Sequence, residues 1–296
     1  MVLHIETVER GSPKKQPAAM RTVALPSGER VPALGLGTWH FGEDPALHAQ
    51  EVATLRHAVD LGVTLIDTAE MYGEGLAEQL IGEALQGRRD EVFIVSKVYP
   101  HNASFYRLPV ACANSLYRLK TDRIDLYLLH WRGSVPLHET VAGFRALQEA
   151  GKIRYWGVSN FDVDDMNELW NVDGGTDVTT DQILYNLTRR APEWALLPWL
   201  RQHRIPIMAY SPIEQARLLK NSKLVQFAKR YGMTPAQAAL AWLLTNDDVI
   251  AIPKTSSPER LEENVAALNI KLTADQLAEL DKYFPPPDGP RPLEVL

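Results

Sequence analysis

The stretches V-T-L-I-D-T (residues 63–68), V-F-I-V-S-K (92–97) and I-D-L-Y-L-L-H (124–130) are short apolar runs, and each carries a polar side chain at its carboxyl end. Those side chains are Asp67, Lys97 and His130, and Tyr72 follows Asp67 by five residues. In a parallel barrel the carboxyl ends of the strands form one face, and active sites are built on that face. The sequence therefore predicts four side chains gathered there for proton chemistry.

Apolar runs of this kind alternate with helical patterns along most of the chain. We expect strands at Leu34–Gly37, Val63–Asp67, Val92–Val98, Ile124–His130, Arg154–Ser159, Asp177–Ile183, Pro206–Tyr210 and Val249–Pro253. We expect helices at Pro45–Leu61, Leu76–Gln86, Arg107–Lys120, Leu137–Ala150, Val163–Trp170, Glu193–Arg204, Leu224–Tyr231, Pro235–Leu244, Pro258–Leu268 and Ala274–Tyr283. Eight such units predict an α/β fold, a (β/α)8 TIM barrel, preceded by a β-hairpin around Pro26-Ser27-Gly28.

The alternative architecture is a doubly wound sheet. Two observations favour the barrel: polar groups end many different strands, and the dinucleotide fingerprint of a doubly wound fold is missing. Gly35 and Gly37 are followed by Thr38-Trp39-His40, so no third glycine stands where that motif requires it.

Length, charge and cysteine content narrow the class of protein. The chain has 296 residues, a net charge of -6 and one cysteine, Cys112. We expect a flexible extension over residues 1–20 and a single barrel domain over residues 21–296. The mild acidity argues against nucleic acid as a partner. We see no membrane span and no secretory signal, and the lack of a disulfide framework fits the cytoplasm.

The three strand-end residues and Tyr72 together suit reduction of a carbonyl. A general acid must deliver a proton to the oxygen, and a cation beside a tyrosine lowers its pKa. Lys97 can be that cation for Tyr72, Asp67 can hold Lys97 charged, and His130 can donate to the carbonyl oxygen. Taken singly, each residue is more often structural than catalytic, but three successive strand ends make the set hard to dismiss.

A second pattern, K-T-S-S-P-E-R at residues 254–260, follows the last strand and opens a helix. Hydroxyl groups, free helix N-terminal N–H groups and two cations suit an anion such as a phosphate monoester. A capped surface helix with two solvated cations is an equally good interpretation of these residues alone.

With these motifs the chain resembles the aldo-keto reductase superfamily from about Thr22 to Tyr283. The runs G-T-W-H-F-G-E-D (37–44), S-K-V-Y-P-H-N-A (96–103) and L-L-P-W-L (196–200) look most like its bacterial methylglyoxal and small-aldehyde reductases. The resemblance is carried by L-G-L-G-T-W (34–39), L-I-D-T-A-E-M-Y-G (65–73), F-I-V-S-K-V (93–98), I-D-L-Y-L-L-H-W (124–131), G-K-I-R-Y-W-G-V-S-N-F (151–161) and I-P-K-T-S-S-P-E-R-L-E-E-N (252–264). It implies a catalytic tetrad of Asp67, Tyr72, Lys97 and His130, with Tyr72 as the acid.

The resemblance also implies that NADPH, as NADPH/NADP+, is the cofactor. Lys254, Thr255, Ser256 and Arg260 match residues that hold its 2′-phosphate, and Glu263 and Asn264 match residues that contact adenine. Ser159, Asn160 and Gln182 would bind the nicotinamide carboxamide, and Tyr210 would stack on the ring. The remaining expected cofactor contacts are Thr38, Trp39, Asp67, Ser211, Pro212, Ile213 and Leu218.

The substrate is expected to be a small-molecule carbonyl, walled by Trp39, Tyr99 and Trp131 beside Tyr72 and His130. Two features depart from many relatives. Glu214-Gln215-Ala216-Arg217-Leu218 replaces a segment that carries glycine and covers the pyrophosphate, and the tail after Tyr283 is short and proline-rich. The sequence does not determine the conformation of this segment. The short tail leads us to expect an accessible pocket.

Several functions compete. The motifs favour NADPH-dependent reduction of methylglyoxal and of small and aromatic aldehydes by a monomeric enzyme, with a keto-sugar reductase of the diketogluconate type as runner-up. A Schiff-base aldolase would use Lys97 as nucleophile, which Asp67 beside it disfavours. A non-catalytic NADP-binding regulator would not need the complete tetrad. No His-x-His pair marks a strand end, so we expect no metal site.

Overall fold

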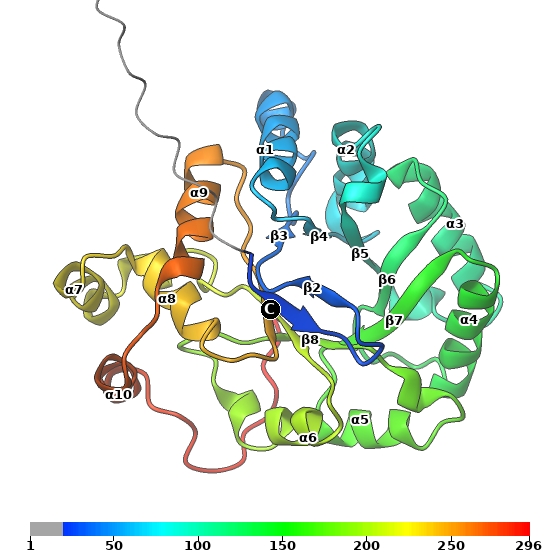
Figure 1. Ribbon diagram of the computed structural model, residues 1–296. Helices are drawn as coiled ribbons and strands as arrows, with labels where there is room; N and C mark the ends of the chain where they lie inside the picture. The colour runs from blue at the N-terminus through cyan, green and yellow to red at the C-terminus, as the bar shows by residue number, and fades with distance from the viewer. Residues whose placement is uncertain (1–19) are drawn as a thin grey trace, which may run out of the picture.

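A computed structural model describes residues 20–296, and it shows a barrel ringed by helices (Figure 1). The barrel strands are β3 (Leu36–Gly37), β4 (Leu65–Asp67), β5 (Phe93–Val98), β6 (Ile124–Leu129), β7 (Ile153–Ser159), β8 (Asp181–Leu184), β9 (Ile207–Tyr210) and β10 (Val249–Ile252). Each strand pairs in parallel with its neighbours in chain order. Backbone hydrogen bonds close the ring, from Gly35 N to Ala251 O (2.9 Å) and from Gly37 N to Pro253 O (3.0 Å). The predicted (β/α)8 fold is confirmed.

The helices form the outer layer of the barrel (Figure 1). They are α1 (His48–Asp60), α2 (Leu76–Ala84), α3 (Leu108–Leu119), α4 (Leu137–Glu149), α5 (Val163–Trp170), α6 (Leu196–Gln202), α7 (Ser222–Arg230), α8 (Pro235–Leu243), α9 (Pro258–Ala266) and α10 (Ala274–Tyr283). Ser257 caps α9, and Thr273 forms a capping box with Gln276 at α10. Among the described residues no helix is long and apolar enough to cross a membrane.

The predicted hairpin is formed by β1 (Thr22–Ala24) and β2 (Arg30–Pro32), which pair antiparallel. The Gly28 backbone, at φ +88°, closes its turn. Its Glu29 accepts a hydrogen bond of 2.7 Å from Tyr155, near the start of β7, so the hairpin covers the N-terminal end of the barrel (Figure 1). Residues 1–19 of the predicted extension lie outside the described residues, whereas Met20 already packs against the core.

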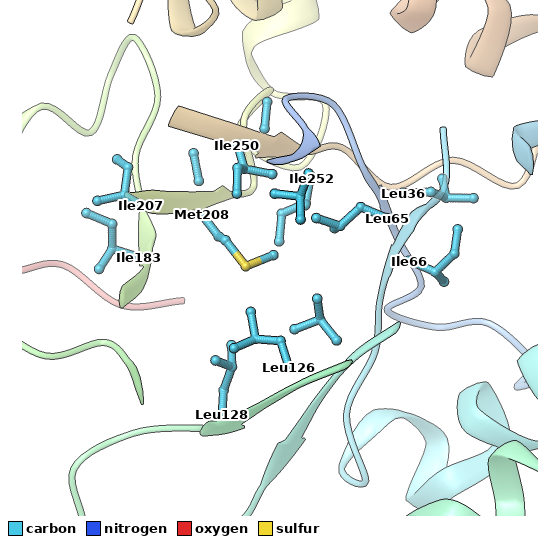
Figure 2. Packing of buried hydrophobic residues seen from close by; sticks show 14 of the residues in the cluster. Leu36, Leu65, Ile66, Leu126, Leu128, Ile183, Ile207, Met208, Ile250 and Ile252 are labelled. Atoms are coloured by element: carbon cyan, nitrogen blue, oxygen red, sulfur yellow. The ribbon is translucent and has the colours of Figure 1, made fainter. Parts of the chain in front are cut away.

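Alternation along the strands sorts side chains between the barrel interior and the helix layer. Leu65, Leu126, Met208 and Ile252 point toward one another inside the barrel, and Ile66 lies on the outer side of its strand (Figure 2). All are buried. The period of two therefore places the next inward position on β4, after Leu65, at Asp67, directly at the carboxyl end of the barrel.

Some predicted boundaries were wrong. The strand expected to begin at Asp177 begins at Asp181, because Gly174 and Gly175 introduce a tight 3-10 turn over Gly175–Asp177. The helix expected from Glu193 begins at Leu196, because Ala195 leaves helical geometry after a separate 3-10 turn over Ala191–Glu193. Likewise, Pro45–Leu47 is a 3-10 turn before α1.

Gly175→Ala should destabilise the fold. An added Cβ would lie 1.8 Å from the Leu169 carbonyl oxygen, so the backbone must move, and we expect a loss of about 2–4 kcal/mol in the free energy of unfolding. Gly289→Ala is the matched control, because its Cβ would meet nothing within 4 Å. Urea denaturation measures both, and equal midpoints would contradict the prediction.

Candidate active site

Lys97 is the centre of the site at the carboxyl end of the barrel. Its side chain is fully buried, and its ammonium donates to Asp67 Oδ2 (2.8 Å), Thr68 O (2.8 Å) and Tyr72 Oη (3.0 Å). An ammonium has three hydrogens, and each has an acceptor here. Burial lowers the pKa of Lys97, but the charge of Asp67 and these hydrogen bonds outweigh burial and raise the pKa above its ordinary value. Lys97 is therefore held charged and in one orientation.

Asp67 is itself held from two other strands. Gln182 Nε2 donates to Asp67 Oδ1 at 2.7 Å, and both the backbone N–H and the hydroxyl of Thr38 donate to the Asp67 carbonyl oxygen at 3.0 and 2.9 Å. All three residues are buried. The sequence predicted Gln182 and Thr38 as cofactor contacts, but it gave no sign that they brace Asp67, because the pairing joins β3, β4 and β8.

Tyr72 reaches Lys97 because the chain turns sharply after β4. It begins a 3-10 turn, Tyr72–Gly75, in which Gly73 and Glu74 both have positive φ. The Lys97 ammonium also lies 4.7 Å from the centre of the Tyr72 ring. Since Tyr72 Oη accepts from Lys97, its own hydroxyl hydrogen is left to donate elsewhere.

Lys97 lowers the Tyr72 pKa as predicted, but burial outweighs this effect. Burial raises this pKa, the Lys97 charge lowers it, and the Asp67 charge raises it again, so the net pKa lies above the usual value. Asp67 cancels much of the field of Lys97, and desolvation of a tyrosinate costs more than the remainder returns. Tyr72 therefore keeps its proton at neutral pH.

His130 stands across from Tyr72, with the ring centres 5.9 Å apart in an edge-on arrangement. Burial and the Lys97 charge lower its pKa to about 3. The imidazole is therefore neutral near pH 7, with one N–H to donate and one nitrogen to accept. Its Nδ1 is buried and has no hydrogen-bond partner among the described residues.

Beside the tetrad, four predicted cofactor residues are joined by hydrogen bonds. Tyr210, at the end of β9, donates to Asn160 Oδ1 (2.8 Å), and Asn160 Nδ2 donates to the His130 carbonyl oxygen (3.1 Å). Ser159 donates to the Gln182 carbonyl oxygen at 2.7 Å. A half-buried aromatic ring with hydroxyl and amide groups at its edge is a suitable set for a flat heterocycle that carries a carboxamide.

The predicted substrate wall consists of aromatic side chains near the tetrad. Trp39 is 40% exposed and Trp131 37% exposed, which is unusual for indoles that are not at an interface. Tyr99 meets Trp131 edge-on, with ring centres 5.9 Å apart, and Trp131 lies 5.0 Å from the His130 ring. Glu70, which sequence reasoning missed, accepts from Tyr99 N at 2.7 Å and so fixes this wall.

The segment 254–260 lies where β10 leads into α9. Lys254 and Arg260 are exposed, and Ser256 is half-buried. Gln50 and Thr54 of α1 both donate to the Ser256 carbonyl oxygen, at 2.6 and 3.0 Å, and so fix this turn. The buried Thr255 hydroxyl accepts from Ser257 N at 3.1 Å, so part of its capacity is used within the turn. Of the predicted adenine contacts, Asn264 is buried and Glu263 is half-buried.

The segment after Tyr210 takes an unusual conformation. Ser211, Glu214, Gln215 and Ala216 all have positive φ. Pro212 and Leu218 are buried and Ile213 is half-buried. Sequence reasoning missed the role of Glu214, which is buried and accepts from Asn186 Nδ2 (2.8 Å) and Arg189 (2.7 and 3.0 Å). Burial raises its pKa, but these donors outweigh burial and lower it, so Glu214 is an anion.

Two other features are remote from this chemistry. A groove of about 950 Å³ between α3 and α4 is lined by Cys112, Lys120 and Lys152 among others, and it opens before β6 and β7, at the opposite end of the barrel. Within residues 20–296, no group of three or more His, Cys, Asp or Glu is placed to hold a metal ion.

Comparison with known proteins decides the family. Residues 33–284 match the aldo/keto reductase family. This chain belongs to the aldo/keto reductase family. It is 48% identical to methylglyoxal reductase YeaE of Escherichia coli over 90% of this chain and 95% of that protein, and 30% identical to methylglyoxal reductase DkgB of Escherichia coli O157:H7 over 85% and 93%. An aldo/keto reductase from Klebsiella pneumoniae, solved with NADP and acetate, superposes with a TM-score of 0.91 at 48% identity and covers 94% of this chain and 100% of that one.

The pKa of His130 can be measured directly. His130 should stay neutral from pH 8 down to about pH 4, so its imidazole signals in NMR should not move over this range. His130→Asn identifies the signals. Because the folded pKa lies below the unfolded value of about 6.5, this residue contributes stability that is complete above pH 6.5 and is lost as the pH falls toward 3. A titration midpoint of the His130 imidazole near pH 6 would contradict its burial beside the charge of Lys97.

Proposed function

We propose that this protein reduces small aldehydes with NADPH and uses Tyr72 as the general acid. The observation that carries the proposal is the chain Asp67–Lys97–Tyr72, with Lys97 donating at 2.8 and 3.0 Å, beside a neutral His130. Lys97 donates all three of its ammonium hydrogens to fixed acceptors. Within the chain Asp67–Lys97–Tyr72, Tyr72 is therefore the residue that can release a proton.

The residues present fit the cofactor. Tyr210 offers a half-buried ring at a strand end, Ser159 and Asn160 offer hydroxyl and amide groups beside it, and Lys254 and Arg260 offer cations for a phosphate. The Klebsiella relative was solved with NADP, and we extend this ligand to the present chain. NADPH, when bound, supplies the hydride.

The residues of the chain then have separate tasks. His130 donates its N–H to the carbonyl oxygen and so orients the carbonyl. Tyr72 delivers its proton to that oxygen as negative charge grows there, since an alkoxide is a far stronger base than a tyrosinate. Lys97 stabilises the tyrosinate that is left, and Asp67 keeps Lys97 charged. Trp39, Tyr99 and Trp131 give the substrate an apolar wall.

The same geometry disfavours a Schiff-base role for Lys97. A nucleophilic amine must be neutral with a free lone pair, whereas this ammonium is paired with Asp67 and saturated with acceptors. The raised pKa of Lys97, caused by Asp67 against the effect of burial, points the same way.

The substrate class is favoured by two relatives named for methylglyoxal reduction. A keto-sugar reductase is the second candidate, because a solved structure described as a putative 2,5-diketo-D-gluconic acid reductase B superposes with a TM-score of 0.80 at 30% identity. The deciding experiment follows loss of NADPH absorbance with methylglyoxal, an aromatic aldehyde and a keto sugar at equal concentrations. A higher kcat/KM for the keto sugar would replace the aldehyde assignment.

Tyr72→Phe should abolish reduction and leave NADPH affinity nearly unchanged. The substitution removes the proton donor and keeps the ring, and we expect kcat to fall about 10²- to 10⁴-fold. Steady-state kinetics and NADPH fluorescence titration measure the two quantities. Tyr106→Phe is the control, because that side chain is 83% exposed. Retained turnover in Tyr72→Phe would refute the acid assignment.

Lys254→Ala combined with Arg260→Ala should weaken NADPH binding much more than NADH binding. Only NADPH carries the 2′-phosphate, and each lost cation removes a charge-assisted hydrogen bond, so we expect Kd for NADPH to rise about 10- to 100-fold. Lys271→Ala combined with Lys282→Ala removes two exposed lysines elsewhere and controls for the same change in net charge. Equal losses for both cofactors would place the phosphate at another site.

A further inference from the structure

The C-terminal tail, residues 285–296, returns to the candidate active site. At its start, Arg190 donates to Asp281 Oδ1 (2.7 Å) and to the Phe284 carbonyl oxygen (2.6 Å). At its end, the backbone N–H of Leu296 lies 3.4 Å from the Tyr210 hydroxyl. The C-terminus accordingly projects onto the middle of the barrel in Figure 1. The chain therefore ends beside the ring that we assign to the nicotinamide.

One guanidinium joins this tail to the segment after Tyr210. Arg189 donates through Nε and one terminal nitrogen to Glu214 Oε1 and through the other to Glu294 Oε1. Glu214 is 6% exposed and Glu294 44% exposed at the side chain, so the inner partner is fixed and the outer one can detach. Arg189 and Arg190 are adjacent between β8 and α6, so one short segment holds both ends of the tail.

The segment after Tyr210 is tied to the same place. Asn186 Nδ2 donates to the Ser211 carbonyl oxygen (2.9 Å) as well as to Glu214, and Arg217 also donates to Glu214 (3.1 Å). A shift of Arg189 therefore changes the partners of Glu214, and with them the path of residues 211–218. This segment begins directly beside Tyr210.

We propose that Glu294 and Arg189 form a latch through which the C-terminal tail holds residues 211–218 closed over bound NADPH and slows its release. The proposal rests on the cofactor site argued above. The carboxylates of Glu214 and Glu294 hold the planar guanidinium of Arg189 from two sides and so fix its orientation. Without Glu294, Arg189 is held by Glu214 from one side only, and the segment opens more often.

The tail acts as a latch rather than a plug. Leu296 approaches the hydroxyl edge of Tyr210, and the same hydroxyl donates to Asn160. A flat group that stacks on the ring face does not have to displace a contact at the ring edge. A plug would compete with the cofactor, and its removal would tighten binding, whereas removal of a latch speeds release.

The test compares Glu294→Gln with Asp288→Asn in the full chain. Both variants replace one tail carboxylate by an amide of the same shape. Among residues 20–296, Asp288 pairs only with Arg291, and both of these side chains are exposed. We measure NADPH release by stopped-flow fluorescence after displacement with excess NADP+. Glu294→Gln should release NADPH about two- to five-fold faster, as expected for a partly exposed ion pair, and Asp288→Asn should match the parent protein.

A deletion of residues 294–296 extends the test, and it should speed release at least as much as Glu294→Gln. Release unchanged in both variants, or slower in either, overturns the latch while leaving the cofactor proposal intact. If Asp288→Asn speeds NADPH release as much as Glu294→Gln does, the effect is due to the charge of the tail, and the latch is overturned. Failure of the parent protein to bind NADPH overturns the cofactor site itself, so the two failures are distinguishable.

Discussion

The buried ammonium of Lys97 is the constraint on which the site depends. An unpaired charge of this kind inside a protein costs several kcal/mol, and a neutral lysine is the usual outcome. Here the charge is kept because Asp67, Thr68 and Tyr72 each supply an acceptor. Those acceptors come from β4 and the turn that follows it, and Lys97 comes from β5, so the pairing of these strands fixes the site.

The barrel interior explains why this arrangement is rigid. The inward side chains below the polar layer are apolar and closely packed, among them Leu65 of β4 and Met208 of β9 (Figure 2). Because side chains alternate along a strand, Asp67 lies on the same face as Leu65, and Tyr210 on the same face as Met208. Gln182 links the two layers, because its amide donates to Asp67 and also lies 3.8 Å from the Met208 sulfur. A shift in any strand would break several of these contacts at once, which keeps the tetrad in one geometry.

The sequence was sufficient to predict the fold and the proximity of Asp67, Tyr72, Lys97 and His130, because both depend on local patterns. Apolar runs with polar ends locate β4, β5 and β6 and the residues at their ends. What could not be predicted depends on distant pairing: the brace of Gln182 on Asp67 spans 115 residues, and Glu70 fixes Tyr99 from 29 residues away. The lowering of the Tyr72 pKa by Lys97 was predictable because the sequence shows a neighbouring cation, but the larger effect of burial was not, because the sequence does not show the degree of burial. The start of β8 was predicted too early because the sequence does not show how crowded the backbone is around Gly175.

The segment with Glu214 shows how a departure from the family pattern is compensated. Glu214, Gln215 and Ala216 hold φ values of 52°, 51° and 67°, and left-handed backbone costs roughly 1–2 kcal/mol per such residue. Glycine would adopt this conformation without that cost, so something else must hold it. The hydrogen bonds from Asn186, Arg189 and Arg217 to Glu214 supply the compensation, since bonds to a buried charge contribute about 1.5–3 kcal/mol each. The two terms are similar in size, so the left-handed backbone of this segment depends on Arg189 and the other donors to Glu214.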